Sequence, residues 1–528
     1  MPTPEKRNNP IRKTHLAGVL IALVAAIVST TLSLIHMGLW LTAKTDTTIP
    51  EASIVFSILS WLNESGSLYR DYSQPPYTTT PYTPFFYILA GSLTKILGVT
   101  VENAYLAGRI VSFTSFFGSV FLVYRISRAL GVDRSSAVLG ALLAAGTPIV
   151  FPWSVSCRPD FLALALGLSG ISCITTPSTR GRLTFWIAGV AWSLSFFTKQ
   201  VFIAAPFAYF LWRIGGKREQ TAAVPLASCV FISAIAALGM NQATHGMFFL
   251  NIFDANLASP SLIDVPRMIL RALVPEFFIV MFLGLVGAVI IFRPAFACGK
   301  GVFEIKADLA RLIILAATVS TIVFGYGVSK PGADQNYFYE PLFLWAIVAT
   351  VAFHHAQAYS ASGVQVAILC IFLTTWGTFR WVDNGLGTHR LALTLAAGQD
   401  IRELVHRTSG EILFISNGFG LRSGRGTSIY DGFNASYLEE QGKINLSSVA
   451  RQIEDRHFSA LLIQRHLSYY GYRITPATLE KAIVLNYQEV SIHPDHLANR
   501  ELPPYRWLVP RQDTSPEATH DLSAANDK

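Results

Sequence analysis

The segment SCRPDFLALALGL, residues 156–168, places two opposite charges directly before a run of apolar residues. Arg158 and Asp160 flank Pro159, and every residue from Phe161 to Leu168 is apolar or glycine. A bare charge is costly inside a lipid bilayer. The segment therefore predicts a membrane helix that begins at its charged end. The two charges are either an anchor at the membrane surface or part of a site.

The composition of the whole chain agrees with a membrane protein. Of the 528 residues, 51% are hydrophobic and 14% are charged, whereas about a quarter of the residues in soluble proteins are charged. Apolar stretches recur from residue 16 to about residue 380, and several approach the ~20 residues that span a bilayer as a helix. The first, 16–43, is too long for a signal-peptide core, so it predicts a retained helix.

The distribution of basic residues predicts the orientation. The cluster Lys6, Arg7, Arg12 and Lys13 precedes the first apolar stretch, which places the N-terminus in the cytoplasm. We interpret 82–98 as a helix in the membrane interface, because a spanning helix there would put Arg125 and Arg128 outside. The spans are then expected near 16–43, 104–125, 135–153, 160–176, 183–199, 200–213, 221–243, 269–292, 309–328, 337–356 and 361–379.

The predicted fold is therefore a membrane all-α, polytopic bundle of about eleven transmembrane helices, with interfacial helices in the first outer loop. The transmembrane domain covers residues 1–380, and its first outer loop covers 44–103. The net charge of +8 follows from this topology, so it does not indicate a nucleic-acid partner. The five cysteines are scattered singly and predict neither disulfides nor a zinc site.

Residues 381–512 are expected to form a small extracytoplasmic α/β domain, followed by a disordered tail at 513–528. The stretches 411–416 and 459–464 are typical of buried strands, and 446–458 is typical of an amphipathic helix between them. The glycine-rich stretch 418–426 is interpreted as a solvated loop in preference to a phosphate-binding loop, because a lone glycine-rich stretch is a weak signal.

With this topology, many polar residues gather at the outer ends of different spans. They are Asp46, Glu51, Asp71, Arg158, Asp160, Lys199, His245, Asp254, Arg267, Lys330, Asp334, Asn336 and Glu340. Each has a plain alternative: Glu51 suits the first turn of a helix, Lys199 can extend to the head groups, and Tyr337 can belong to an aromatic belt. Together they suit a reaction in which a carboxylate removes a proton from a hydroxyl and a phosphate leaves beside cations.

Several of these stretches resemble the GT-C type integral-membrane glycosyltransferases, the superfamily of protein O-mannosyltransferases and lipid A aminoarabinose transferases. The resemblance is carried by DTTIPEA (46–52), GSLYRDYSQPPYTTTPYTPFFYILAG (66–91), AGRIVSF (107–113), CRPDFLALAL (157–166), FFTKQ (196–200) and KPGADQNYFYE (330–340). Each motif is loose, but their order and their common outer side make the match specific.

The resemblance implies transfer of a sugar from a polyprenyl-phosphate donor to a lipid, glycan or protein acceptor on the extracytoplasmic face, with inversion. It implies a catalytic general base in the first outer loop, at Glu51 or Asp46. The adjacent Asp-Glu pair of relatives is Pro50-Glu51 in this chain, which favours Glu51 as the second acid and leaves the role of Asp46 open. The candidate substrate-binding residues are Asp71, Arg158, Asp160, Lys199, Lys330, Asp334, Asn336, Tyr337 and Glu340, of which Arg158, Lys199 and Lys330 are the candidates for the phosphate on chemical grounds.

No cofactor is required by these residues, and a divalent metal stays an open alternative. A transporter or flippase of a lipid-linked saccharide is the alternative function. It ranks second because the charges gather at one face and the chain shows no convincing internal repeat. The expected location is the bacterial inner membrane, with several passes. The sequence does not specify the sugar or the acceptor.

Overall fold

The computed structural model describes most of the chain. The described residues are 34–35, 37–43, 46, 51–63, 67–147, 150–176, 182–215, 224–256, 277–292, 305–327, 330, 335–359, 388–424, 426–464, 475–490 and 505–512. The chain divides into two compact units. The helical unit contains Met1–Arg70 and Thr79–Ala392, and the sheet unit contains Asp71–Thr78 and Leu393–Lys528.

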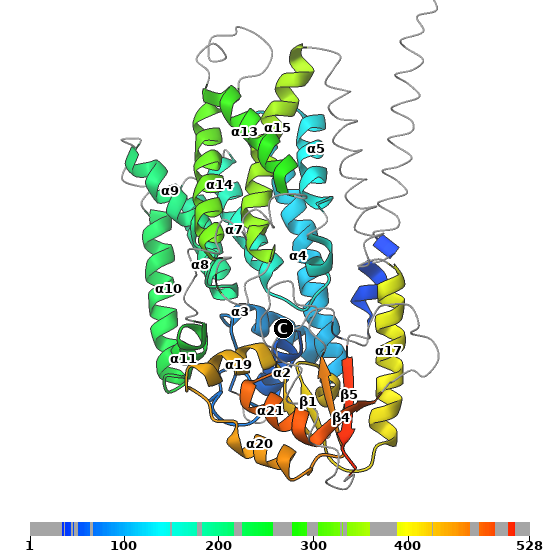
Figure 1. The fold of residues 1–528 in the computed structure, drawn as a ribbon. Coiled ribbons are helices and arrows are strands. Elements are labelled where there is room, and N and C mark those ends of the chain that lie inside the picture. Colours follow the sequence, from blue (N-terminus) through cyan, green and yellow to red (C-terminus); the bar gives the residue numbers. More distant parts are fainter. Residues whose placement is uncertain are drawn as a thin grey trace, which may run out of the picture. The chain divides into compact units, whose positions relative to one another are not determined.

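The helical unit is a bundle of apolar helices (Figure 1). Its elements are α2 Glu51–Leu62, α3 Phe85–Leu97, α4 Val101–Ala129, α5 Arg134–Ala145, α6 Phe151–Ser154, α7 Asp160–Thr175, α8 Arg182–Thr198, α9 Ala204–Gly215, α10 Val224–Ala243, α11 Met247–Ile252, η3 Asp254–Asn256, α13 Phe278–Phe292, α14 Ala307–Gly327, η6 Gln335–Phe338 and α15 Tyr339–Tyr359. Helix α7 packs between α4 and α8, and α15 packs against α13 and α14.

Helices occupy nine of the predicted spans in the described part of the chain, from α4 to α15. Four of the described helices are long and apolar enough to cross a membrane, and others, including α7 and α8, are apolar but shorter. The span predicted at 361–379 and most of the one at 16–43 lie outside the described residues. The number of about eleven spans therefore stays a prediction.

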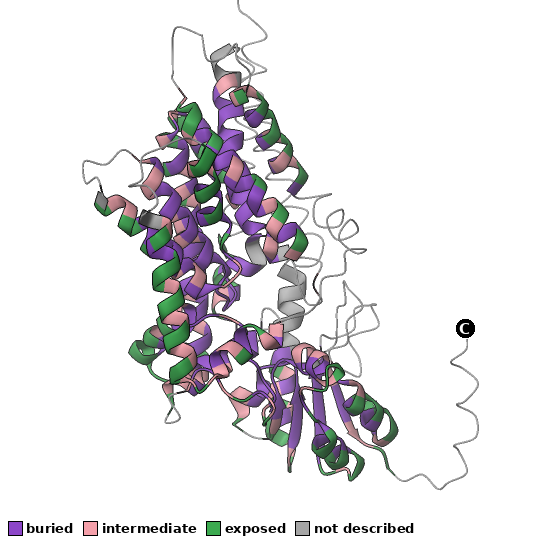
Figure 2. Cartoon of the chain, turned by 90° about the vertical axis from the view of Figure 1, so that its left-hand side faces the viewer, coloured by how far each residue is buried: buried purple, intermediate pink, exposed green. Residues whose placement is uncertain are grey.

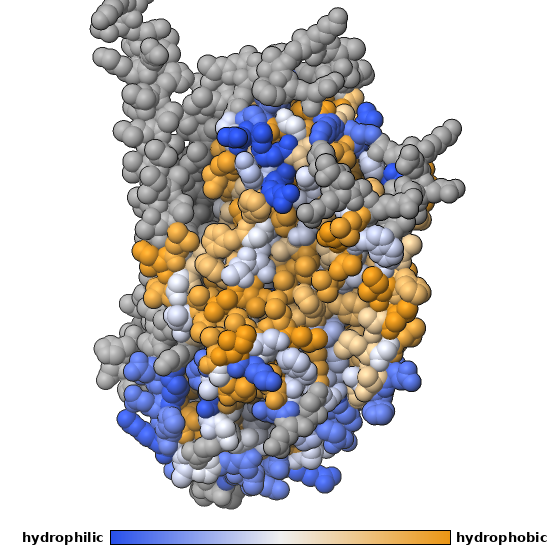
Figure 3. Space-filling model, turned by 180° about the vertical axis from the view of Figure 1, so that it is seen from behind, coloured by the Kyte–Doolittle hydropathy of each residue, from blue (hydrophilic) through white to orange (hydrophobic). Residues whose placement is uncertain are grey.

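Burial within the helical unit differs strongly between helices. In the spanning window of Asn336–His355, 89% of the residues are buried, against 11% for Leu226–Ala243 in α10. Figure 2 shows buried residues concentrated inside the helical unit and exposed residues along its outer helices. The exposed side chains of α10 are apolar, among them Val230, Phe231 and Leu238. Figure 3 shows hydrophobic residues forming a continuous area over the surface of the helical unit. A surface of this kind is stable against lipid and unfavourable in water, so the chain is an integral membrane protein.

The sheet unit contains a five-stranded sheet in the order β2-β1-β3-β5-β4. Its elements, with the helix that leads into it, are α17 Thr388–Arg407, β1 Ile412–Ile415, α18 Phe419–Ser423, β2 Thr427–Ile429, α19 Gly432–Glu440, α20 Ser447–Glu454, β3 Ala460–Gln464, α21 Ala477–Asn486, β4 Tyr487–Val490 and β5 Tyr505–Pro510. Strand β1 is parallel to β2 and β3, and β5 is antiparallel to β3 and β4.

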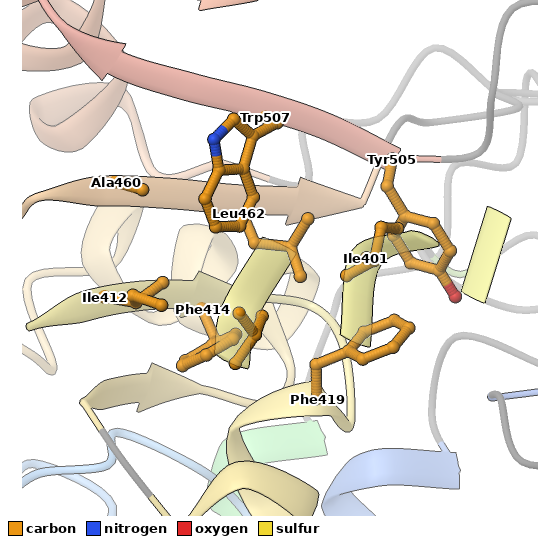
Figure 4. Close-up of a cluster of buried hydrophobic side chains, with 9 residues drawn as sticks. Ile401, Ile412, Phe414, Phe419, Ala460, Leu462, Tyr505 and Trp507 are labelled. Atoms are coloured by element: carbon orange, nitrogen blue, oxygen red, sulfur yellow. The ribbon is translucent and has the colours of Figure 1, made fainter. Parts of the chain in front are cut away.

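The two predicted strands are confirmed as β1 and β3, and α20 lies within the predicted helix 446–458. Figure 4 shows the apolar side chains that hold the sheet to its helices, including Phe414, Leu462 and Trp507. The expected domain boundaries at 381–512 stay a prediction, and the tail at 513–528 lies outside the described residues.

The interpretation of 418–426 as a solvated loop was wrong for its first half. Residues Phe419–Ser423 form the short helix α18. Phe419 is buried in the core of the sheet unit, where its ring packs edge-on against Tyr505 at a centroid distance of 5.3 Å. Burial of one aromatic side chain gives a free-energy gain that a solvated loop would lose.

Candidate active site

Glu51, the first residue of α2, is a fully buried carboxylate with three donors around it. The Arg109 guanidinium binds both of its oxygens, with Nε at 3.1 Å from Oε1 and Nη2 at 2.9 Å from Oε2. The backbone N–H of Cys157 also donates to Oε1, at 2.5 Å. A bidentate arginine–carboxylate pair is among the strongest hydrogen-bonded contacts in proteins. Glu51 is therefore a fixed, charge-balanced group.

Asp46 lies in the segment that leads into α2, and it is 6% exposed. It accepts a hydrogen bond from the hydroxyl of Tyr105, which is on α4. Arg109 follows Tyr105 by one helical turn, and its Cζ lies 5.2 Å from the centre of the Tyr105 ring. Helix α4 thus supplies side chains to both carboxylates. We call Asp46, Glu51, Tyr105 and Arg109 the acid cluster.

Asp160, the first residue of α7, is the centre of a second buried group. Its oxygens accept hydrogen bonds from Arg158 Nε at 3.1 Å, from Lys199 Nζ at 2.5 Å and from Asn336 Nδ2 at 2.6 Å. Arg158 is 5% exposed and Lys199 is 3% exposed. One carboxylate thus faces two cations. We call Arg158, Asp160, Lys199 and Asn336 the cation cluster.

Aromatic rings surround the two cations of this cluster. Arg158 stacks over Trp153 with its Cζ 4.1 Å from the ring centre, and its Nη2 donates to the Tyr82 hydroxyl at 2.9 Å. Lys199 Nζ lies 5.6 Å from the ring centre of Tyr82 and 5.1 Å from that of Tyr337. Ring faces stabilise cations without neutralising them. The cluster therefore keeps an excess of positive charge.

The acid cluster and the cation cluster meet at two successive residues. Cys157 donates to Glu51, and Arg158 belongs to the cation cluster. Ser112 of α4 binds the backbone here, because its hydroxyl donates a hydrogen bond to the Arg158 carbonyl at 2.7 Å. A Cβ at Gly108 would overlap the Cys157 sulfur, so the glycine allows the chain to approach α4 this closely.

The other candidate residues make different contacts. Glu340 of α15 is buried, and its Oε2 accepts a hydrogen bond from Ser320 at 3.1 Å. Asp71, in the sheet unit, accepts from the Ser73 N–H at 2.9 Å. Among the residues that the structure describes, Asp71, Lys330 and Glu340 form no ion pair. Asp334 lies outside the described residues.

Two residues of the acid cluster, Tyr105 and Arg109, and two aromatic residues that contact Arg158, Tyr82 and Trp153, were missed as candidates from the sequence. Arg109 carried a usable signal, because an arginine inside a long apolar stretch needs a buried partner. The aromatic residues carried none, since tyrosine and tryptophan are common near membrane surfaces for other reasons. The described residues contain no group of three or more His, Cys, Asp or Glu that could hold a metal ion.

Residues 75–214 match a family model described as the N-terminal domain of alpha-(1->6)-mannopyranosyltransferases. A comparison with curated proteins gives no match. ArnT from Cupriavidus metallidurans bound to undecaprenyl phosphate is a similar solved structure, with 11% identity and a TM-score of 0.56 over 94% of this chain and 97% of that chain. Archaeal oligosaccharyltransferase AglB from Archaeoglobus fulgidus, in complex with an inhibitory peptide and a dolichol-phosphate, is another, with 13% identity and a TM-score of 0.52 over 96% of this chain and 75% of that chain.

At such low identities a structural likeness establishes the fold. Both solved structures are transferases of the superfamily that the sequence motifs indicated, and the matched family model lies in the same superfamily. The chain therefore has the fold of the GT-C type integral-membrane glycosyltransferases.

Proposed function

We propose that the protein transfers a sugar from a polyprenyl-phosphate donor to a hydroxyl of an acceptor on the extracytoplasmic face of the membrane. The observation that carries this proposal is the buried cation cluster directly beside a buried carboxylate cluster. The ArnT structure contains undecaprenyl phosphate and the AglB structure contains a dolichol-phosphate, which supports a donor of this class.

The cation cluster suits the phosphate of the donor. Arg158 and Lys199 together carry one more charge than Asp160 neutralises. A phosphate that gains negative charge as its bond to the sugar breaks is stabilised most by cations held in a water-poor site. Arg158 is positioned by Asp160 and Trp153, so little reorganisation is needed when the phosphate arrives.

We assign the role of general base to Asp46. Both oxygens of Glu51 bind the Arg109 guanidinium, and taking up a proton would break that pair. Asp46 instead accepts a hydrogen bond from the neutral hydroxyl of Tyr105. Glu51 then fixes the start of α2 in this proposal.

The reaction follows from these roles. Asp46 removes the proton from the acceptor hydroxyl, whose oxygen forms a bond to the anomeric carbon of the sugar. The bond between that carbon and the phosphate oxygen breaks, and the electron pair leaves with polyprenyl phosphate toward Arg158 and Lys199. Attack opposite the leaving group inverts the anomeric carbon. No metal is needed for the charge balance of this scheme.

The match of residues 75–214 to a mannopyranosyltransferase model makes mannose our proposed donor sugar. The test incubates the purified full-length protein with polyprenyl-phosphate mannose, glucose, arabinose and aminoarabinose, and measures free polyprenyl phosphate. Release from the mannose donor is expected. Release from none of the donors would contradict the proposed function.

Asp46→Asn and Glu51→Gln separate the two carboxylates. We expect Asp46→Asn to lower kcat by roughly 10³-fold, because a positioned general base contributes about 10²–10⁴-fold. Glu51→Gln retains an acceptor for Arg109, so its kcat is expected to fall less than that of Asp46→Asn. If Asp46→Asn consumes donor as fast as the wild type, Asp46 is not the base.

A further inference from the structure

The geometry points to Arg109 as the residue that positions the Asp46 carboxylate for proton transfer, by holding both ends of the segment that carries it. Arg109 is 1% exposed on α4, and the proposed reaction steps give it no role. The inference rests on the proposed role of Asp46 as the base. Arg109 contacts no reacting atom in this scheme, so it acts through other residues.

The Arg109 guanidinium reaches residues that precede and follow Asp46 in the sequence. Arg109 Nη1 donates hydrogen bonds to the carbonyl of Trp40, at 3.2 Å, and to that of Ala43, at 2.5 Å. Nε and Nη2 bind Glu51. Ala43 and Glu51 lie on either side of Asp46 in the sequence. One planar group thus bonds to both Ala43 and Glu51.

Arg109 also contacts the tyrosine that binds Asp46. Tyr105 lies one helical turn before Arg109, and the guanidinium lies over its ring. The hydroxyl of the same ring donates to Asp46. Arg109 therefore contacts residues that precede and follow Asp46 in the sequence, and it also contacts the side-chain partner of Asp46.

These contacts require an arginine side chain. A lysine could neutralise Glu51, but a single ammonium group cannot bind both Glu51 oxygens and two carbonyls with the planar fork of arginine. Arg109→Lys thus keeps the charge and loses the fixed spacing. Misplacement of a reacting group by about 1 Å is enough to lower a rate ~100-fold.

The experiment is a double-mutant cycle on the full-length protein, with kcat and KM measured for a polyprenyl-phosphate sugar donor that the wild type consumes. We expect Arg109→Lys to lower kcat about 100-fold with KM changed less than ~2-fold. In the Asp46→Asn background Arg109→Lys should lower kcat no further, because the group that it positions is already gone. Arg128→Lys, on the same helix but outside both clusters, is the matched control and should keep wild-type kcat.

Two results would overturn the inference: a kcat for Arg109→Lys equal to that of Arg128→Lys, or losses that multiply in Arg109→Lys/Asp46→Asn. If Arg109→Lys does not fold, Arg109→Gln/Glu51→Gln replaces it in the cycle, since this pair leaves no unpaired buried charge. A fully active Asp46→Asn would instead refute the proposed role of Asp46 as the base, and release of polyprenyl phosphate from none of the donors would refute the proposed function, so these failures are distinguished.

Discussion

Asp160 shows how a single carboxylate can organise a site made from four parts of the chain. It begins α7 and binds Arg158 before that helix, Lys199 after α8 and Asn336 in η6. Pro159 and Asp160 also suit the first turn of a helix, as the sequence alone indicated. The interpretation of Arg158 as an anchor at the membrane surface does not describe its surroundings, because its side chain is buried against Trp153 and Asp160.

Asp160→Asn should destabilise the protein by about 3–5 kcal/mol, because it leaves two buried cations without their carboxylate. The measurement is the apparent Tm in detergent. Asp160→Asn/Lys199→Met removes one cation as well, and it should be more stable than Asp160→Asn alone. Undecaprenyl phosphate should raise the Tm of Asp160→Asn more than that of the wild type, since its phosphate replaces the missing charge. A double variant that is less stable than the single one would contradict this account.

At the scale of elements, the loop between α4 and α5 shows how a helix start is fixed. Asp133 caps α5 by accepting from the Ser136 N–H at 3.0 Å, and its other oxygen lies 2.7 Å from His354 Nδ1 on α15. Burial acts to raise the pKa of Asp133, but hydrogen bonds from Ser135, Ser136 and His354 outweigh it and hold that pKa well below its usual range. The cap therefore joins α5 to α15.

Variants of Asp133, measured over a range of pH, test this contact between α5 and α15. Asp133→Ala should lower stability by about 1 kcal/mol, whereas Asp133→Asn keeps the cap and loses only the charge. Because the folded pKa of Asp133 is depressed, its stabilisation is complete above the unfolded value of about 4 and is lost as the pH falls toward the folded pKa. The apparent Tm of the wild type and Asp133→Asn should therefore converge at acidic pH. Equal Tm values at neutral pH would show that the charge of Asp133 contributes nothing.

At the scale of the whole molecule, the predicted topology assigns a side of the membrane to each unit. The sheet unit is expected outside and the loop before α5 inside, because this arrangement keeps the basic loop residues in the cytoplasm. Exposed residues on each side can be labelled. In intact cells, a membrane-impermeant maleimide should modify Glu454→Cys and leave Arg134→Cys unmodified. The reverse pattern would invert the topology, and with it the side on which we place the reaction.

The sequence by itself determined the class of the protein and the positions of its apolar helices, because hydropathy and the placement of basic residues are local properties. It also indicated β1, β3 and the GT-C resemblance. Arg158, Asp160, Lys199 and Asn336 were candidates from the sequence, since charges at the ends of apolar stretches are visible without a structure.

Only the tertiary structure decided which of these residues meet. It paired Glu51 with Arg109, linked Asp46 to Tyr105 and left Glu340 beside Ser320. The physical reason is that a buried ion pair depends on the packing of helices far apart in sequence, and spacing along the chain does not encode that packing. Glu51 and Arg109, fifty-eight positions apart, become partners because α2 and α4 pack together.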